Sequence, residues 1–144
     1  MTLEYSITTD PRRFDLDAIH AFLSRSYWSP GVPIGVVRKA IENSLAFGLL
    51  LGDEQIGFAR VVTDKATFAY LADVYVLEAH RGKGLSQRLL AAVFAHEELQ
   101  GLRRFMLATR DAHTLYARFG FTALANPARM MERMNPDVYA APRA

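Results

Sequence analysis

The stretch from Tyr70 to Leu90, YLADVYVLEAHRGKGLSQRLL, constrains the fold of this chain more than any other part of it. Its first part, up to Val76, is rich in apolar residues and predicts a strand, whereas Leu85 opens a run with helical spacing. Gly82 and Gly84 lie in the short charged turn between the two. The first amides of a helix have no partner within it, and the helix dipole places its positive end beside them. The stretch therefore predicts a strand, a glycine turn and a helix that together bind a phosphate-bearing ligand.

Strands and helices also alternate along the rest of the chain. Apolar spacing and turn-forming residues predict strands at Leu3–Thr9, Phe47–Leu51, Gln55–Thr63, Thr67–Val76, Arg103–Ala108, Phe121–Leu124 and Met130–Met134. They predict helices at Asp15–Ser26, at Ile34–Ser44, from Leu85 until the pattern fades at His96–Glu98, and at Ala112–Phe119. The strand at Arg103–Ala108 follows a helical crossover, so it should lie parallel to Thr67–Val76. We therefore expect a mixed α/β fold of the α+β kind, in which about four helices flank a mostly antiparallel central sheet of six to seven strands with one parallel pair at its centre.

Composition limits the classes of protein to which this chain can belong. Its 144 residues suit one domain spanning 1–144, with a tail after about residue 136 that we expect to be loosely held. The absence of cysteine excludes disulfides and thiolate metal sites, and no His or carboxylate cluster has metal-ligand spacing. A formal charge of +2 does not indicate a nucleic-acid partner, and no apolar run approaches the roughly 18 residues of a membrane span. We expect a soluble cytoplasmic protein with no metal, nucleic-acid or membrane partner.

The glycine turn fits neither of the two commonest phosphate-binding patterns. A P-loop needs a glycine five residues before its Gly-Lys pair, where this chain has Leu77, and the dinucleotide fingerprint needs a third glycine where Gln87 stands. The run Arg81-Gly82-Lys83-Gly84-Leu85-Ser86 instead resembles the signature of the GNAT superfamily of N-acetyltransferases, which is Arg or Gln, two residues, Gly, one residue, then Gly or Ala. Ser86 stands in place of that last small residue, which is a small substitution. The order of the predicted elements is similar to that family over nearly the whole chain. The resemblance implies that the amides of this loop hold the pyrophosphate of acetyl-CoA.

The strand before the loop has a second role in that family. The resemblance implies that its end splays away from the next parallel strand, so that free backbone groups pair with the pantetheine arm and the thioester carbonyl of acetyl-CoA. These backbone groups belong to Val74, Tyr75 and Val76, and the amide of Val74 or its neighbour is the implied oxyanion donor. Apolar content alone would favour an ordinary buried strand, but the adjacent loop favours the functional interpretation.

A third similarity lies beyond the parallel strand. Many family members carry Asn, two residues, Ala, three residues, Tyr, three residues and Gly-Phe, and this chain has, in the same register, Thr109, Ala112, Tyr116, Gly120 and Phe121. Thr109 stands where Asn is usual. The resemblance implies that Thr109, Ala112 and Tyr116 contact the cofactor, and that Tyr116 is the general acid that protonates the departing CoA thiolate. A tyrosine with a pKa of about 10 is protonated at neutral pH and can donate. The alternative for Tyr116 is a half-buried packing residue on an amphipathic helix.

The acceptor side of the predicted site is less clearly defined. The loop Ser26–Pro33 carries Tyr27 and Trp28, which either line an acceptor pocket or fix the loop to the core. Asp73 is a candidate for the general base or for a group that holds a cationic acceptor, and His113 is a further candidate on the acceptor side. A water chain is the alternative route for the proton that the amine loses.

Strand alternation bears directly on Asp73. It divides the strand into one face with Tyr70, Ala72, Val74 and Val76 and another with Leu71, Asp73 and Tyr75. Asp73 then faces away from the acetyl group, unless a β-bulge redirects it. Ala72 stands where some relatives, including spermidine/spermine acetyltransferase, have Glu, so one carboxylate that could act as the base is missing.

We therefore expect an N-acetyltransferase that moves an acetyl group from acetyl-CoA to a primary amine by direct attack in a ternary complex. A small-molecule amine is the expected acceptor, and a peptide or protein amine is the alternative substrate. A non-catalytic acyl-CoA-binding sensor or interaction module is the alternative class of protein. Met130, Met131 and Met134 either form an apolar patch suited to a homodimer or belong to the core.

Overall fold

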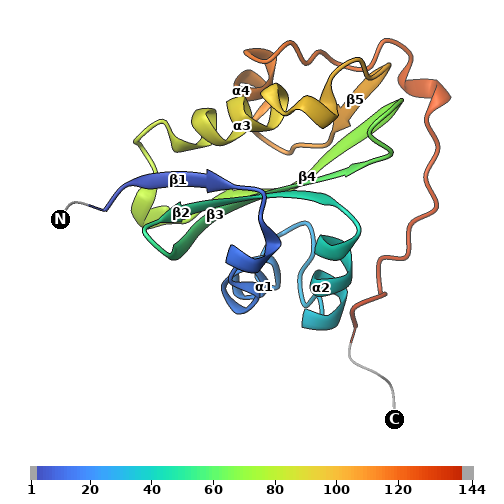
Figure 1. The fold of residues 1–144 in the computed structure, drawn as a ribbon. Coiled ribbons are helices and arrows are strands. Elements are labelled where there is room, and N and C mark those ends of the chain that lie inside the picture. Colours follow the sequence, from blue (N-terminus) through green and yellow to red (C-terminus); the bar gives the residue numbers. More distant parts are fainter. Residues whose placement is uncertain (1–2, 141–144) are drawn as a thin grey trace. The chain divides into compact units, whose positions relative to one another are not determined.

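The structure is a computed structural model that describes residues 3–140 (Figure 1). The chain divides into two compact units, Met1–Ala108 and Thr109–Ala144. The first unit holds a sheet with helices on both of its faces, and the second holds one short helix with loops. No helix within residues 3–140 combines the length and the apolar character that crossing a membrane requires.

The first unit is built on a sheet of five strands. They are β1 (Tyr5–Thr8), β2 (Leu45–Leu51), β3 (Glu54–Thr63), β4 (Phe68–Val76) and β5 (Arg104–Leu107), and their order in the sheet is β1-β2-β3-β4-β5. The first four strands pair antiparallel, and β5 pairs parallel with β4. The predicted antiparallel meander and the parallel crossover are therefore confirmed.

The expected number of six to seven strands is wrong. Neither Phe121–Leu124 nor Met130–Met134 forms a strand; this part of the chain is irregular apart from the short 3-10 helix η4 (Pro127–Arg129). A strand needs one face to bury, whereas Met131 is 95% exposed. Without these strands the parallel pair lies at one edge of the sheet and not at its centre.

Helices cover both faces of the sheet in the first unit. Figure 1 shows α1 (Leu16–Leu23) and α2 (Ile34–Glu42) on one face and α3 (Leu85–Ala95) on the other. The first unit also contains the short 3-10 helices η1 (Pro11–Arg13), η2 (Glu78–His80) and η3 (Glu97–Leu99). On its sheet side α3 buries Leu85, Leu89, Leu90 and Val93. The hydrophobic layer on each face holds β4 in place, and β4 leads into the glycine turn.

The second unit contains α4 (His113–Ala117) and the η4 turn. A further turn lies between Asn135 and Ala140, where the amide of Val138 donates to Asn135 and that of Ala140 to Asp137. The tail predicted to be loosely held after residue 136 includes residues 141–144, which lie outside the described residues.

Candidate functional site

The glycine turn leaves a row of backbone amides open at the start of α3. Gly82 and Gly84 have φ angles of 78° and 73°, and a Cβ atom on either would meet no atom within 4 Å. These glycines are therefore needed for their left-handed backbone angles and not for lack of space. Among the described residues, no atom accepts a hydrogen bond from the amides of residues 82–87. Together with the helix dipole, these amides form a site suited to an anion.

Side chains next to the turn hold it and add positive charge. Arg81 Nε donates to the carbonyl oxygen of Val76 at 2.9 Å, which ties the turn to the end of β4. Lys83 Nζ lies 3.3 Å from the hydroxyl of Tyr5, and that hydroxyl lies 3.0 Å from Nδ1 of His80. Sequence reasoning did not single out Tyr5 or His80. The contact spans 75 positions of sequence, and no local pattern indicates it.

The parallel pair opens before β4 ends. Pairing with β5 runs from Phe68 opposite Arg104 to Leu71 opposite Leu107, whereas β4 continues to Val76. Within the described residues, no strand pairs with that edge of residues 72–76. The strand end that carries Val74, Tyr75 and Val76 therefore has backbone groups available to a ligand.

A β-bulge interrupts β4 at Asp73 and Val74. On β3, Phe58 pairs with Tyr75 and Arg60 with Ala72, so Ala59 alone lies opposite both Asp73 and Val74. The φ angle of Asp73 is 57°, in the left-handed region that aspartate tolerates better than most residues.

The bulge makes the predicted alternation wrong beyond Ala72. Phe58 and Arg60 lie on the same face of β3, so their partners Tyr75 and Ala72 share a face too. The Tyr75 ring stacks on Phe22 of α1, with centroids 3.9 Å apart. Burial raises the pKa of the Tyr75 hydroxyl, and the nearby carboxylates of Asp15 and Asp73 raise it further.

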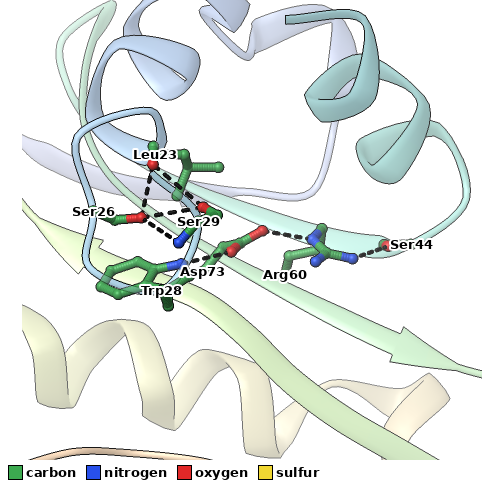
Figure 2. A network of polar contacts seen from close by, with 7 residues as sticks. All are labelled: Leu23, Ser26, Trp28, Ser29, Ser44, Arg60 and Asp73. Atoms are coloured by element: carbon green, nitrogen blue, oxygen red, sulfur yellow. Dashed lines mark hydrogen bonds and ion pairs between the residues drawn. The ribbon is translucent and has the colours of Figure 1, made fainter. Parts of the chain in front are cut away.

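The bulge also redirects Asp73, which becomes the centre of a polar network (Figure 2). Its Oδ1 accepts a hydrogen bond from Nε1 of Trp28 at 2.9 Å, and its Oδ2 accepts one from Nε of Arg60 at 2.7 Å. The Nη1 atom of Arg60 donates to the hydroxyl of Ser44 at 3.2 Å. The side chains of Arg60 and Asp73 are only 19% and 11% exposed, so this ion pair is shielded from water. Each oxygen of Asp73 thus accepts one hydrogen bond from a different segment.

The loop between α1 and α2 is braced internally where it carries Trp28. The Ser26 hydroxyl donates to the Leu23 carbonyl at 2.7 Å and accepts from the amide of Ser29 at 3.1 Å. Trp28 is 40% exposed, and its ring meets that of Tyr27 edge-on, with centroids 5.0 Å apart. The structure therefore brings Trp28 and Asp73 together, and Tyr27 contacts Trp28. Sequence reasoning missed Arg60, although a lone arginine in the apolar run IGFARVV was a usable signal.

In the second unit, the remaining predicted residues form one short helical segment. The amide of Ala112 donates to the hydroxyl of Thr109 at 3.0 Å, which satisfies one amide where α4 begins. Tyr116 lies on α4, and its ring centroid is 6.1 Å from that of Phe121. His113 is exposed at the first position of α4. No group of three His, Asp or Glu side chains within residues 3–140 is arranged to hold a metal ion.

Comparisons with known proteins identify the family of this chain. A family model described as an acetyltransferase (GNAT) domain matches residues 42–123. The Gibberella zeae protein named putative acetyltransferase FG08082 is 35% identical, with 80% of this chain and 77% of that protein covered. A GNAT family protein of Xanthomonas campestris pv. campestris has 48% identity and a TM-score of 0.93, covering 98% of this chain and 100% of that one. A Clostridium acetobutylicum protein solved with acetyl-CoA shares the fold at 12% identity, with a TM-score of 0.65 over 92% of this chain and 96% of that one.

Proposed function

Because this chain belongs to the GNAT acetyltransferase family, we propose that it is an N-acetyltransferase that transfers acetyl from acetyl-CoA to the primary amine of a small molecule. The family implies acyl transfer from acetyl-CoA. One observation carries the proposal for this chain: the unpartnered amides of residues 82–87 follow directly from a strand whose last residues are unpaired on one edge.

The residues of the first unit fit the cofactor at two places. The amides of the loop from Arg81 to Ser86, with the ammonium of Lys83 nearby, would hold the pyrophosphate as hydrogen-bond donors to an anion. The backbone of Val74, Tyr75 and Val76 would hold the pantetheine arm. The cofactor supplies an acetyl group activated as a thioester, and the protein supplies its orientation.

Two groups would act on the reacting atoms. The amide of Val74 would donate to the carbonyl oxygen as negative charge develops there, when the amine nitrogen forms its bond to the carbonyl carbon. The hydroxyl of Tyr116 would give its proton to the sulfur as the carbon–sulfur bond breaks. Thr109 and Ala112 would contact the cofactor beside Tyr116. In this proposal the amine gives up its proton to water, and Asp73 stays in its ion pair with Arg60 and its hydrogen bond with Trp28.

The acceptor would lie against the aromatic loop between α1 and α2. Trp28 presents a partly exposed ring beside the Arg60–Asp73 ion pair, and Tyr27 extends that aromatic surface. In this proposal Asp73 shapes the acceptor side and is not the base, while His113 is a further acceptor contact. A compact aromatic surface of this kind favours a small amine over an extended peptide.

An amine panel tests the proposal. Purified protein is incubated with acetyl-CoA and small alkyl, aromatic and polyamine acceptors, or with lysine peptides, and thiol release from CoA is followed. We expect turnover with at least one small amine and weaker turnover with peptides. Turnover with peptides alone would move the acceptor to a protein amine. Binding of acetyl-CoA without turnover of any amine would indicate a sensor.

A homodimer remains a prediction for this chain. The side chains of Met131 and Met134 are 95% and 73% exposed, so they are available to form an apolar patch. Sedimentation at increasing protein concentration should show association that Met131→Ser weakens. A monomer at every concentration would contradict this prediction.

A further inference from the structure

We propose that Arg60 and Trp28 are positioning residues for acyl transfer, which they serve by holding Asp73 and, through it, the β4 bulge that sets the direction of the Val74 amide. This inference rests on the proposed function, because the amide of Val74 is the oxyanion donor in that proposal. Neither Arg60 nor Trp28 needs to touch the reacting atoms for this role.

The bulge is a backbone conformation that needs support. Asp73 has a φ angle of 57°, and a residue with a Cβ atom in the left-handed region is sterically disfavoured unless its surroundings hold it there. Asp73 and Val74 together face the single residue Ala59, so the regular ladder does not determine their orientation. Rotation of this segment would turn the Val74 amide, since that amide belongs to the peptide group that follows Asp73.

The side chain of Asp73 supplies the missing support. Each carboxylate oxygen is held by a donor from a different segment: Trp28 belongs to the loop between α1 and α2, and Arg60 to β3. Arg60 is held in turn by Ser44, which directly precedes β2. Charge-assisted hydrogen bonds that are shielded from water are stronger and more directional than exposed ones. A carboxylate fixed at both oxygens leaves its own Cα little freedom to rotate.

The network can also be interpreted as purely structural, and kinetics separate the two interpretations. The hydrogen bond from the Val74 amide stabilises the reaction most when negative charge develops on the carbonyl oxygen. An amide that points elsewhere therefore lowers kcat. The side chains that brace the pyrophosphate loop, Arg81 and Lys83, bond to Val76 and Tyr5 and not to the network around Asp73, so the KM for acetyl-CoA should be preserved. A purely structural network would lower the melting temperature and leave the kcat of the folded protein unchanged.

Three single variants test the proposal. Asp73→Ala removes both hydrogen bonds and keeps the Cβ atom that disfavours the left-handed angle, so the bulge loses its support. Trp28→Phe keeps an aromatic ring and removes the donor, and Arg60→Met removes the guanidinium. We expect each to lower kcat by about 10-fold, with the KM for acetyl-CoA within about 2-fold of the original. Arg12→Met, which breaks the exposed Arg12–Asp10 pair, is the matched control and should leave kcat unchanged.

The double variant Trp28→Phe/Arg60→Met tests the shared route through Asp73. Its loss of kcat should approach that of Asp73→Ala and fall short of the product of the two single losses. A loss of kcat in the double variant equal to the product of the two single losses would overturn the shared route. An unchanged kcat in folded Asp73→Ala would overturn the proposal itself. Losses of kcat that match the fraction of unfolded protein in each variant would also overturn the proposal. If Arg60→Met fails to fold, Asp73→Ala and Trp28→Phe decide between the two interpretations. Failure of the original protein to turn over any amine would instead overturn the proposed function, and with it this inference.

Discussion

A single hydroxyl distinguishes Tyr116 from phenylalanine, and the proposed chemistry depends on that group. Tyr116→Phe keeps the ring that lies 6.1 Å from Phe121 and removes the only proton that Tyr116 can give to sulfur. We expect kcat to fall by roughly 100-fold or more, while the KM for acetyl-CoA stays nearly constant, because an acid acts on the departing thiolate and not on cofactor binding. Steady-state kinetics with the best amine of the panel measure both constants.

The matched control for this change is Tyr139→Phe. Tyr139 belongs to the same unit, Thr109–Ala144, and the proposal gives it no role in the site. Its loss of a hydroxyl should leave kcat unaltered. If Tyr116→Phe turned over as fast as the original protein, Tyr116 would be the packing residue that its amphipathic helix also allows, and the acid would have to be sought elsewhere.

At the scale of an element, the start of α3 depends on the backbone angle of Gly84. Gly84→Ala places a Cβ in open space but at a φ angle of 73°, so the free energy of unfolding should fall by about 1 kcal/mol. The dissociation constant for acetyl-CoA should rise, because a relaxed turn no longer aims its amides at one point. Urea unfolding and titration calorimetry measure the two effects.

Gly35→Ala is the control for that substitution, because it should change the free energy of unfolding in the opposite direction. Gly35 lies in α2 without a positive φ angle, and nothing lies within 4 Å of the place that an added methyl group would take. Alanine there should stabilise the helix by up to about 1 kcal/mol. Acetyl-CoA affinity should not change. Equal effects of the two substitutions would contradict the role given to the angle of Gly84.

The turn between β3 and β4 is built on Asp64. The hydroxyl of Thr67 donates to its carboxylate at 2.6 Å, and the amides of Thr67, Ala66 and Phe68 donate too, so the pKa of Asp64 lies below its usual value. The unfolded chain therefore takes up the proton first as pH falls. The stabilisation from this turn is complete above the ordinary pKa of about 3.9 and is lost as pH drops below it.

Thr67→Val tests this pH dependence. Without the hydroxyl, the pKa of Asp64 should move back toward its usual value, so the variant should be less stable at neutral pH and should lose less stability on acidification. Urea unfolding between about pH 6 and pH 2 gives both quantities. Thr122→Val is the control, since the hydroxyl of Thr122 donates to a backbone carbonyl and not to a carboxylate. Parallel pH profiles for the original protein and Thr67→Val would refute the assignment.

Element boundaries and motifs were predictable where local chemistry decides them. Gly82, Gly84 and the apolar spacing after Leu85 indicate the turn and α3 without any knowledge of the rest of the fold. The bulge at Asp73 could be named from the sequence only as an alternative, because regular alternation is the expectation for a strand until its register against β3 is known. The ion pair between Arg60 and Asp73 could not be predicted either, because it depends on the same register. The strands predicted at Phe121–Leu124 and Met130–Met134 are absent for a related reason: apolar residues such as Met131 do not form a strand without a face to bury.

At the scale of the whole molecule, the proposed residues fall in both compact units. The loop from Arg81 to Ser86 belongs to Met1–Ala108, and Tyr116 belongs to Thr109–Ala144. The proposal assigns cofactor binding mainly to the loop and proton transfer to Tyr116. Binding and transfer should therefore respond to different substitutions in the full-length protein.

Ligand-linked stability separates these two activities in one measurement. A ligand that binds only the folded protein, at a free concentration of 100 times its Kd, stabilises it by about 2.7 kcal/mol, which corresponds to a rise in melting temperature of roughly 8 °C for a chain of this size. We expect acetyl-CoA to produce this rise in the original protein and in Tyr116→Phe alike, and a smaller rise in Gly84→Ala at the same concentration. Since Tyr116→Phe should bind without efficient transfer, it should behave as a sensor would. A lost shift in Tyr116→Phe would mean that this hydroxyl serves cofactor binding, and an undiminished shift in Gly84→Ala would remove the glycine turn from the cofactor site.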